Sequence, residues 1–161
     1  MNQKFLPTEF TVPLELETPD FRIRMLTVHD VVKDYDAVMS SIDHLQGVFG
    51  PNSSWPSADL TLEQDLIDLG WHQKEFQCRS SFAYTVVTLD ESRVLGCVYI
   101  EASEKSAHDA QIFMWVRADV VAAGYDAKLY ATVKTWVGTE WPFANPAFPG
   151  RDIDWERWVA L

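Results

Sequence analysis

The segment VLGCVYI, residues 94–100, constrains the fold more than any other stretch of the chain. It contains no charged side chain and has no polar face. A strand with one face in water alternates apolar and polar residues, whereas a strand buried on both faces has no such need. We therefore predict a central strand at residues 94–100, inside a sheet that is covered on both faces.

Other segments supply the rest of such a sheet and its cover. Three have the alternation, or the β-branched and aromatic composition, of strands, and they comprise residues 21–25, 82–88 and 107–116. Three more place apolar residues every three or four positions, as amphipathic helices do, and they comprise residues 31–42, 61–76 and 122–137. Thr27 and Thr61 begin capping-box patterns. This order predicts a mixed α/β (α+β) domain with a largely antiparallel sheet.

The length of 161 residues is enough for one domain with a full core. Residues 1–20 carry three prolines and are predicted as an extended or irregular N-terminal arm across the domain surface. Residues 21–161 then form the single domain. The tail after Gly138 also contains three prolines, and it can support a short strand and a helical turn from Asp154.

The charge of the chain narrows the classes of partner. The formal net charge is -11, from 24 acidic and 13 basic residues. Such a surface repels phosphate backbones, which argues against nucleic acid as a partner. The negative charge either keeps the protein soluble or attracts an amine-bearing substrate. No apolar run approaches transmembrane length, and the first ten residues lack the pattern of a secretory signal. We therefore expect a cytoplasmic protein with no membrane partner.

The cysteines, histidines and serines show no pattern of a cysteine motif, a metal site or a serine hydrolase. Cys78 and Cys97 are too far apart for a local motif and are expected to be free, structural thiols. The four histidines lack ligand spacing, so no metal site is predicted. The pair Ser80-Ser81 has no nearby histidine in a nucleophile-elbow context, so nothing supports a serine hydrolase.

Three stretches of the chain resemble the GNAT superfamily of acyl-CoA-dependent N-acyltransferases. FRIRMLTVHDVVKDYDAVM is similar to its first strand and helix, VLGCVYI to its third strand, and IFMWVRADVVAAGYDAKLY to its fourth strand and cofactor helix. The resemblance covers roughly residues 21–140. It implies a GNAT-like sheet flanked by helices, and transfer of an acetyl group from acetyl-CoA to a small-molecule amine. Only 23 residues follow Gly138, so the C-terminal half is shortened, and a second chain could complete the sheet as a homodimer.

The resemblance also implies a coenzyme site at the start of the cofactor helix. In the superfamily a loop of the form R-G-x-G-x-G binds the pyrophosphate through backbone N–H groups. The six matching positions here read VAAGYD, residues 121–126, and Gly124 is the one glycine that matches. Asp126 either repels phosphate or complements the helix dipole. The implied cofactor-binding residues are Val116, Arg117, Ala122, Ala123, Gly124 and Tyr125.

Acyl transfer to an amine needs a base and a place for the amine. The positions that match the superfamily's base are Asp109 and Glu101, with His108 as a third option; each can equally be a solvated residue at a strand end. Trp55 lies in the Gly-, Pro- and Ser-rich loop 47–58 and is predicted to bind substrate.

Two features near the C-terminus bear on catalysis. No tyrosine follows Tyr130, so the acid that the superfamily often carries in a later helix is missing. Arg151 either binds an anion or pairs with Asp152. Two functions therefore stay open: an N-acetyltransferase, or a protein of the same shape that binds a ligand or partner without catalysis.

Overall fold

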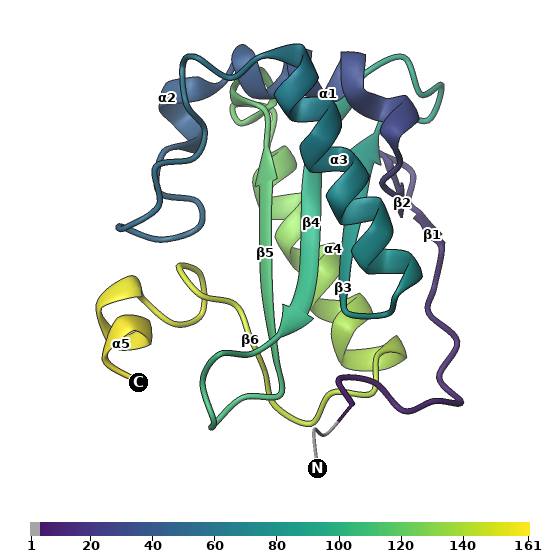
Figure 1. Cartoon of the computed structure of the whole chain (residues 1–161), viewed down its shortest axis with the longest axis vertical. Coiled ribbons are helices and arrows are strands. Elements are labelled where there is room, and N and C mark those ends of the chain that lie inside the picture. Colours follow the sequence, from purple (N-terminus) through teal and green to yellow (C-terminus); the bar gives the residue numbers. More distant parts are fainter. Residues whose placement is uncertain (1–3) are drawn as a thin grey trace.

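The computed structural model describes residues 4–161 of the chain. One six-stranded sheet, ordered β1-β2-β3-β4-β5-β6, runs through these residues with helices on both faces (Figure 1). The strands are β1 (Glu15–Glu17), β2 (Arg22–Met25), β3 (Ser81–Val87), β4 (Val94–Ala102), β5 (Ala110–Val116) and β6 (Pro146–Ala147). The helices are α1 (Val31–Met39), α2 (Ile42–Leu45), α3 (Leu62–Gln77), α4 (Tyr125–Glu140) and α5 (Trp155–Ala160), with short 3-10 turns η1 (Val28–Asp30) and η2 (Ala118–Val120).

The pairing of the strands confirms the predicted fold class. Neighbouring strands from β1 to β5 are antiparallel, and β5 and β6 are parallel. β4 contains the predicted central segment and is paired on both sides, with β3 and with β5. Gly96 allows this close pairing, since a Cβ there would overlap the Trp115 carbonyl of β5. The result is a mixed α/β domain with a largely antiparallel sheet.

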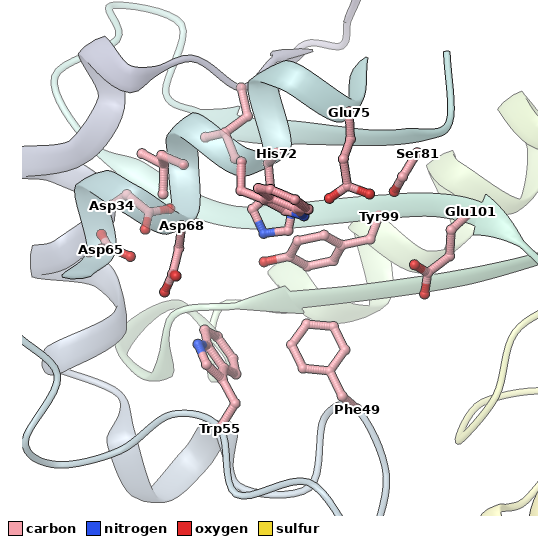
Figure 2. A pocket seen from close by; sticks show the side chains of 13 residues that line it. Asp34, Phe49, Trp55, Asp65, Asp68, His72, Glu75, Ser81, Tyr99 and Glu101 are labelled. Carbon is pink, nitrogen blue, oxygen red and sulfur yellow. The ribbon is translucent and has the colours of Figure 1, made fainter. Parts of the chain in front are cut away.

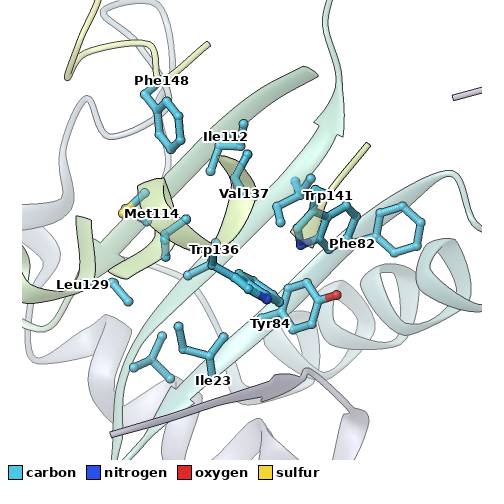
Figure 3. Packing of buried hydrophobic residues seen from close by; sticks show 14 of the residues in the cluster. Ile23, Phe82, Tyr84, Ile112, Met114, Leu129, Trp136, Val137, Trp141 and Phe148 are labelled. Atoms are coloured by element: carbon cyan, nitrogen blue, oxygen red, sulfur yellow. The ribbon is translucent and has the colours of Figure 1, made fainter. Parts of the chain in front are cut away.

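Apolar clusters cover both faces of the sheet. Between the sheet and α4, aromatic rings pack edge to face: Tyr84 on Trp136 at 5.1 Å between centroids, and Phe82 on Trp141 at 5.5 Å (Figure 3). Beneath α1 and α3, a second cluster includes Leu69 and Trp115. Burial on both sides explains why the central strand carries no polar face.

Three residues of the predicted N-terminal arm join the sheet, and the other described residues before them, 4–14, have no regular secondary structure. Its residues Glu15–Glu17 form β1, which pairs antiparallel with β2. Leu6 is 3% exposed and belongs to the core, and the Tyr84 hydroxyl donates to the Pro13 carbonyl at 2.6 Å. β1 and β6 form the two edges of the sheet, and its completion by a second chain stays a prediction.

The predicted helix over residues 31–42 is interrupted. α1 ends at Met39, and α2 begins at Ile42. The two serines between them bond to the backbone: Ser40 Oγ donates to the Ala37 carbonyl, and Ser41 Oγ accepts from the Ala118 N–H. Serine hydroxyls compete in this way with the helix ladder, which explains the break.

The helix predicted over residues 122–137 begins later and ends later, as α4. Gly124 precedes it with a left-handed φ of 83°, which glycine adopts without strain. No helix in residues 4–161 is both long and apolar enough to cross a bilayer. Cys78 is exposed and Cys97 is buried, and both are free thiols, as predicted.

Candidate functional site

A cavity of about 440 Å³ opens between α3 and the loop at residues 47–58, over the middle of β4 (Figure 2). We name it the acidic–aromatic cavity after its two kinds of lining residue. The carboxyl groups are those of Asp34, Asp65, Asp68, Glu75 and Glu101, and the aromatic rings are those of Phe49, Trp55, Trp71, His72 and Tyr99. Leu26, Leu69 and Ser81 complete the lining. A cavity of this volume is large enough for a small organic ligand.

Two elements bring these side chains together. On α3 the acidic residues and His72 recur at steps of three or four, which places them on one face of the helix. The loop is held over β4 by aromatic contacts of Phe49, whose ring lies 5.2 Å from Trp55 and 5.1 Å from Tyr99. Tyr99 is fixed in turn, because its hydroxyl accepts from Trp115 Nε1 at 3.1 Å. The aromatic wall is therefore anchored to the core.

The carboxyl groups of the cavity are not neutralised by the chain. No Lys or Arg lines the cavity, and no ion pair within residues 4–161 involves any of its five acids. Asp34 and Asp65 are each 4% exposed, and Asp65 Oδ2 is buried without a hydrogen-bond partner among these residues. A buried oxygen of this kind is costly to leave unpaired, so the cavity favours a ligand that brings a positive charge or a donor.

Burial also changes the proton affinities of the cavity. Desolvation, followed by the charge of Asp65, raises the pKa of Asp34 well above its usual range. Desolvation raises the pKa of Asp65, although a hydrogen bond with Asp34 acts in the opposite direction. Desolvation lowers the pKa of His72, which keeps its ring neutral at pH 7. The cavity therefore combines carboxyl groups with neutral aromatic surfaces.

Of the three residues predicted as a base, Glu101 lines the cavity and the other two do not. Burial raises the pKa of Glu101, and Gln111 Nε2 donates to its carboxylate at 3.1 Å. Asp109 instead accepts from the backbone N–H groups of Ala144 and Asn145, at 2.6 and 3.0 Å. His108 Nδ1 contacts the Asn145 carbonyl at 3.2 Å. Asp109 and His108 thus hold the tail in place.

Trp55, the residue predicted to bind substrate, does line the cavity. Its ring lies 6.0 Å from that of Trp115, with the planes inclined by 46°. It is partly buried, so it offers part of its surface to the cavity and part to the core.

A second cavity, of about 310 Å³, lies beside β5 where that strand parts from the tail. β5 and β6 pair over two positions, Ala110 with Pro146 and Gln111 with Ala147, and then diverge. The space between them is bounded by residues 44–48, 113–116, 149–151 and Trp155, and it reaches Asp126 at the start of α4. We name it the β5–tail groove.

Arg151 enters the β5–tail groove and is held there. Its guanidinium donates to both carboxylate oxygens of Asp126, at 3.1 and 2.9 Å, and to the Met114 carbonyl at 3.2 Å. It also lies 5.2 Å from the centre of the Tyr130 ring. The predicted partner of Arg151 was Asp152, and the structure corrects this: Asp152 accepts from the Phe148 N–H, and Arg151 pairs with Asp126.

The comparisons with known proteins bear on the fold. No protein-family model matches the chain, and no curated protein matches it. Several solved structures do. The ribosomal-protein-S5-alanine acetyltransferase from Vibrio fischeri superposes with a TM-score of 0.61 at 16% identity, over 78% of this chain and 67% of that one. The chain has the GNAT fold.

Two further structures with this fold carry a coenzyme. The microcin C7 self immunity acetyltransferase MccE, in complex with acetyl-CoA and AMP, has a TM-score of 0.61 at 12% identity, over 79% of this chain and 68% of that one. The RimL ribosomal L7/L12 acetyltransferase, in complex with coenzyme A, has a TM-score of 0.58 at 16% identity, over 78% and 67%. At these identities the likeness establishes the GNAT fold of this chain.

Some of the residues predicted to bind a coenzyme are placed where they could do so, at the start of α4. α4 begins at Tyr125, and its first backbone bond runs from the Lys128 N–H to the Gly124 carbonyl, so the N–H groups of residues 125–127 are free to meet an anion. Ala122 and Ala123 are exposed beside them, and a Cβ on Gly124 would meet no atom within 4 Å. The backbone cradle is therefore open.

The two remaining residues predicted to bind the coenzyme are buried. Val116 belongs to the cluster under α4 and also lines the β5–tail groove. Arg117 is 5% exposed and pairs with Asp119 at 2.8 Å and with Asp36 at 3.2 Å, so its charge is already neutralised. The groove itself is lined by Arg151, whose charge Asp126 neutralises, and by His44, whose Nε2 contacts the Val116 carbonyl at 3.1 Å.

The acids of α1 and α3 were missed by the sequence interpretation. Asp34 and Asp65 carried a signal, because each lies on the apolar face of its helix: Asp65 is four residues before the buried Leu69, and Asp34 is four before the buried Val38. An acidic residue at a core position of an amphipathic helix indicates a side chain that faces a buried site rather than the solvent.

Proposed function

We propose that this protein is an N-acetyltransferase that takes a small cationic amine in the acidic–aromatic cavity and an acyl-CoA in the β5–tail groove. The observation that carries the proposal is the acidity of the cavity: five carboxyl groups line it without a Lys or Arg partner in residues 4–161, and Asp65 Oδ2 is buried without a hydrogen-bond partner among them. Carboxylates attract an ammonium group, and aromatic faces add cation–π attraction.

Glu101 is the residue best suited to accept the proton of the amine. It lines the acidic–aromatic cavity and also a neighbouring hollow bounded by Phe49, Phe113 and Trp155. Its raised pKa brings it closer to neutral pH, where a general base is most effective. An acyl-CoA supplies the activated thioester. The residues of this chain bind the amine, remove its proton and exclude water around it.

A second function is favoured by a specific observation. Arg151 and Asp126 occupy the β5–tail groove, and Asp126 places a carboxylate in the first turn of α4. A protein in which this pair remained closed would bind the amine without transferring an acetyl group. The two functions share the amine cavity and differ in the groove.

Titration calorimetry separates them. Wild-type protein is titrated with a panel of alkylamines, then with acetyl-CoA, and release of the coenzyme thiol is followed when both are present. Thiol release that depends on the amine, and that falls at least about 100-fold in Glu101→Gln, supports the transferase. Amine binding without acetyl-CoA binding supports the second function. Absence of amine binding would contradict both.

A further inference from the structure

The acids of the cavity form two groups rather than one. Figure 2 shows Asp34, Asp65 and Asp68 at one end and Glu75 and Glu101 at the other. Asp68 and Glu75 are seven residues apart on α3, which corresponds to about 10 Å along the helix axis. A single ammonium group cannot contact both ends at this separation.

The first end contains the deepest acids. Asp34 and Asp65 are buried and lie close enough to share a hydrogen bond, and Asp65 Oδ2 lacks a partner among the described residues. Asp68 is partly exposed beside them and accepts from Gln64 Nε2 at 2.9 Å. The hydrogen bond between Asp34 and Asp65 uses one proton, so the carboxyl oxygens that remain at this end can accept a donor from a ligand.

The second end is linked to the β5–tail groove by a third hollow. Glu75 and Glu101 line this end together with Ser81, and Glu101 also borders the hollow that contains Phe113 and Trp155. Phe113 and Trp155 line the β5–tail groove as well.

The middle of the cavity is aromatic and uncharged. Phe49, Trp55, Tyr99 and the neutral ring of His72 lie between the two acidic ends (Figure 2). Rings of this kind suit a chain of methylene groups and tolerate a charge at either end of it. A metal ion does not fit the arrangement, because no group of three or more His, Cys, Asp or Glu side chains in residues 4–161 could hold one.

We propose that the amine is a linear diamine or polyamine whose two ammonium groups span the cavity. The inner ammonium is anchored by Asp34, Asp65 and Asp68, and the outer one is held by Glu75 and Glu101, where the proposed transfer would take place. This inference rests on the proposed amine function and specifies its substrate class.

Matched pairs of ligands test the spacing. The probes are α,ω-diaminoalkanes from 1,4-diaminobutane to 1,8-diaminooctane, each compared by calorimetry with the 1-aminoalkane of equal carbon number. The buffer contains about 0.15 M salt, which screens unspecific attraction to a protein of net charge -11. We expect the best diamine to bind at least about tenfold more tightly than its monoamine, because a second charge-assisted contact is made.

Variants at each end locate the two contacts. Asp65→Asn and Glu75→Gln should each reduce the preference for the diamine to less than about threefold. Asp68→Asn repeats the test at the inner end if Asp65→Asn fails to fold. Glu63→Gln is the matched control, since it removes one exposed charge from the same helix outside the cavity and should leave the preference unchanged.

The outcomes separate this inference from the function on which it rests. A monoamine that binds as tightly as every diamine would overturn the two-ended site and leave amine binding intact. A preference for the diamine that survives both Asp65→Asn and Glu75→Gln would also overturn it. If neither class of amine binds, the proposed function itself fails.

Discussion

The acidic side chains of the two cavities differ in whether they have a basic partner. In the β5–tail groove, Asp126 is neutralised by Arg151 through two hydrogen bonds. In the acidic–aromatic cavity, Asp65 Oδ2 is buried without a hydrogen-bond partner among the described residues, and none of the five acids pairs with a Lys or Arg there. A carboxylate that pairs with an arginine of the same chain helps to hold the fold, whereas buried carboxyl groups without such a partner are costly and have raised pKa values. The groove therefore satisfies its acid within the fold, and the cavity leaves its acids available to a ligand.

Displacing the tail should give the largest effect and test whether the two regions are independent. Gly150 has a φ of 79°, and a Cβ there would lie 2.5 Å from Trp155 Nε1. Gly150→Ala therefore adds backbone strain and a steric overlap, which together destabilise the fold by about 3 kcal/mol and lower Tm by about 10 °C. Amine affinity should stay within about twofold. Loss of amine binding in a folded variant would show that the tail supports the cavity as well.

Replacing Asp65 should raise the stability of the fold and weaken amine binding. Asp65→Asn removes an ionisable group buried without a full set of partners, so unfolding at pH 7 should require about 1 kcal/mol more free energy. The same change should weaken amine binding at least about tenfold. Chemical denaturation and calorimetry on one preparation measure both. If the variant is less stable, Asp65 holds the fold together, and the contrast between the two regions is wrong.

The dependence of stability on pH tests whether the buried acids of the cavity destabilise the fold when they are ionised. The folded-state pKa values of Asp34, Asp65 and Glu101 are raised, chiefly by burial. The folded protein therefore holds more protons than the unfolded chain, and the contribution of these groups to stability falls as pH rises from about 4 through their raised pKa values. The loss is about 1.4 kcal/mol for each unit by which a pKa is raised.

Urea denaturation between pH 4 and 7 measures this effect as a difference between proteins. The stability of Asp65→Asn relative to wild type should increase with pH over this range, and a saturating diamine should reduce that gap. A gap that is constant with pH would mean that Asp65 has no raised pKa in the folded protein.

The sequence predicted the sheet because its strands carry local signals. The uncharged run at residues 94–100 can form only a strand that is buried on both faces, and that strand became β4. The three-residue strand β1 carries no such signal, since its pairing with β2 depends on tertiary contacts. The break between α1 and α2 was missed because Ser40 and Ser41 bond to the backbone, which a helical periodicity does not register.

Two lining residues of the acidic–aromatic cavity were named from the sequence because their position in the fold identified them. Glu101 at the end of a strand and Trp55 in a long loop were both assigned, and both line the cavity. Asp34 and Asp65 were not, because an acidic residue on a helix usually faces solvent. The pair of Arg151 and Asp126 joins residues 25 positions apart across two elements, and no spacing rule connects them.

Opening the groove should give the smallest effect and decide between the two functions. Asp126→Asn removes the carboxylate that holds Arg151 and that lies in the first turn of α4. Because the pair is partly exposed, its loss should lower stability by no more than about 1 kcal/mol. The freed guanidinium can then pair with a phosphate in the groove, and acetyl-CoA should bind about threefold to tenfold more tightly, as calorimetry can measure. Amine affinity should not change.

Asp119→Asn is the control, since Asp119 pairs with Arg117 and Arg93 outside the groove. An unchanged affinity for acetyl-CoA in Asp126→Asn would mean that the pair does not close the groove, and an absence of acetyl-CoA binding in both proteins would favour the amine-binding function over the transferase.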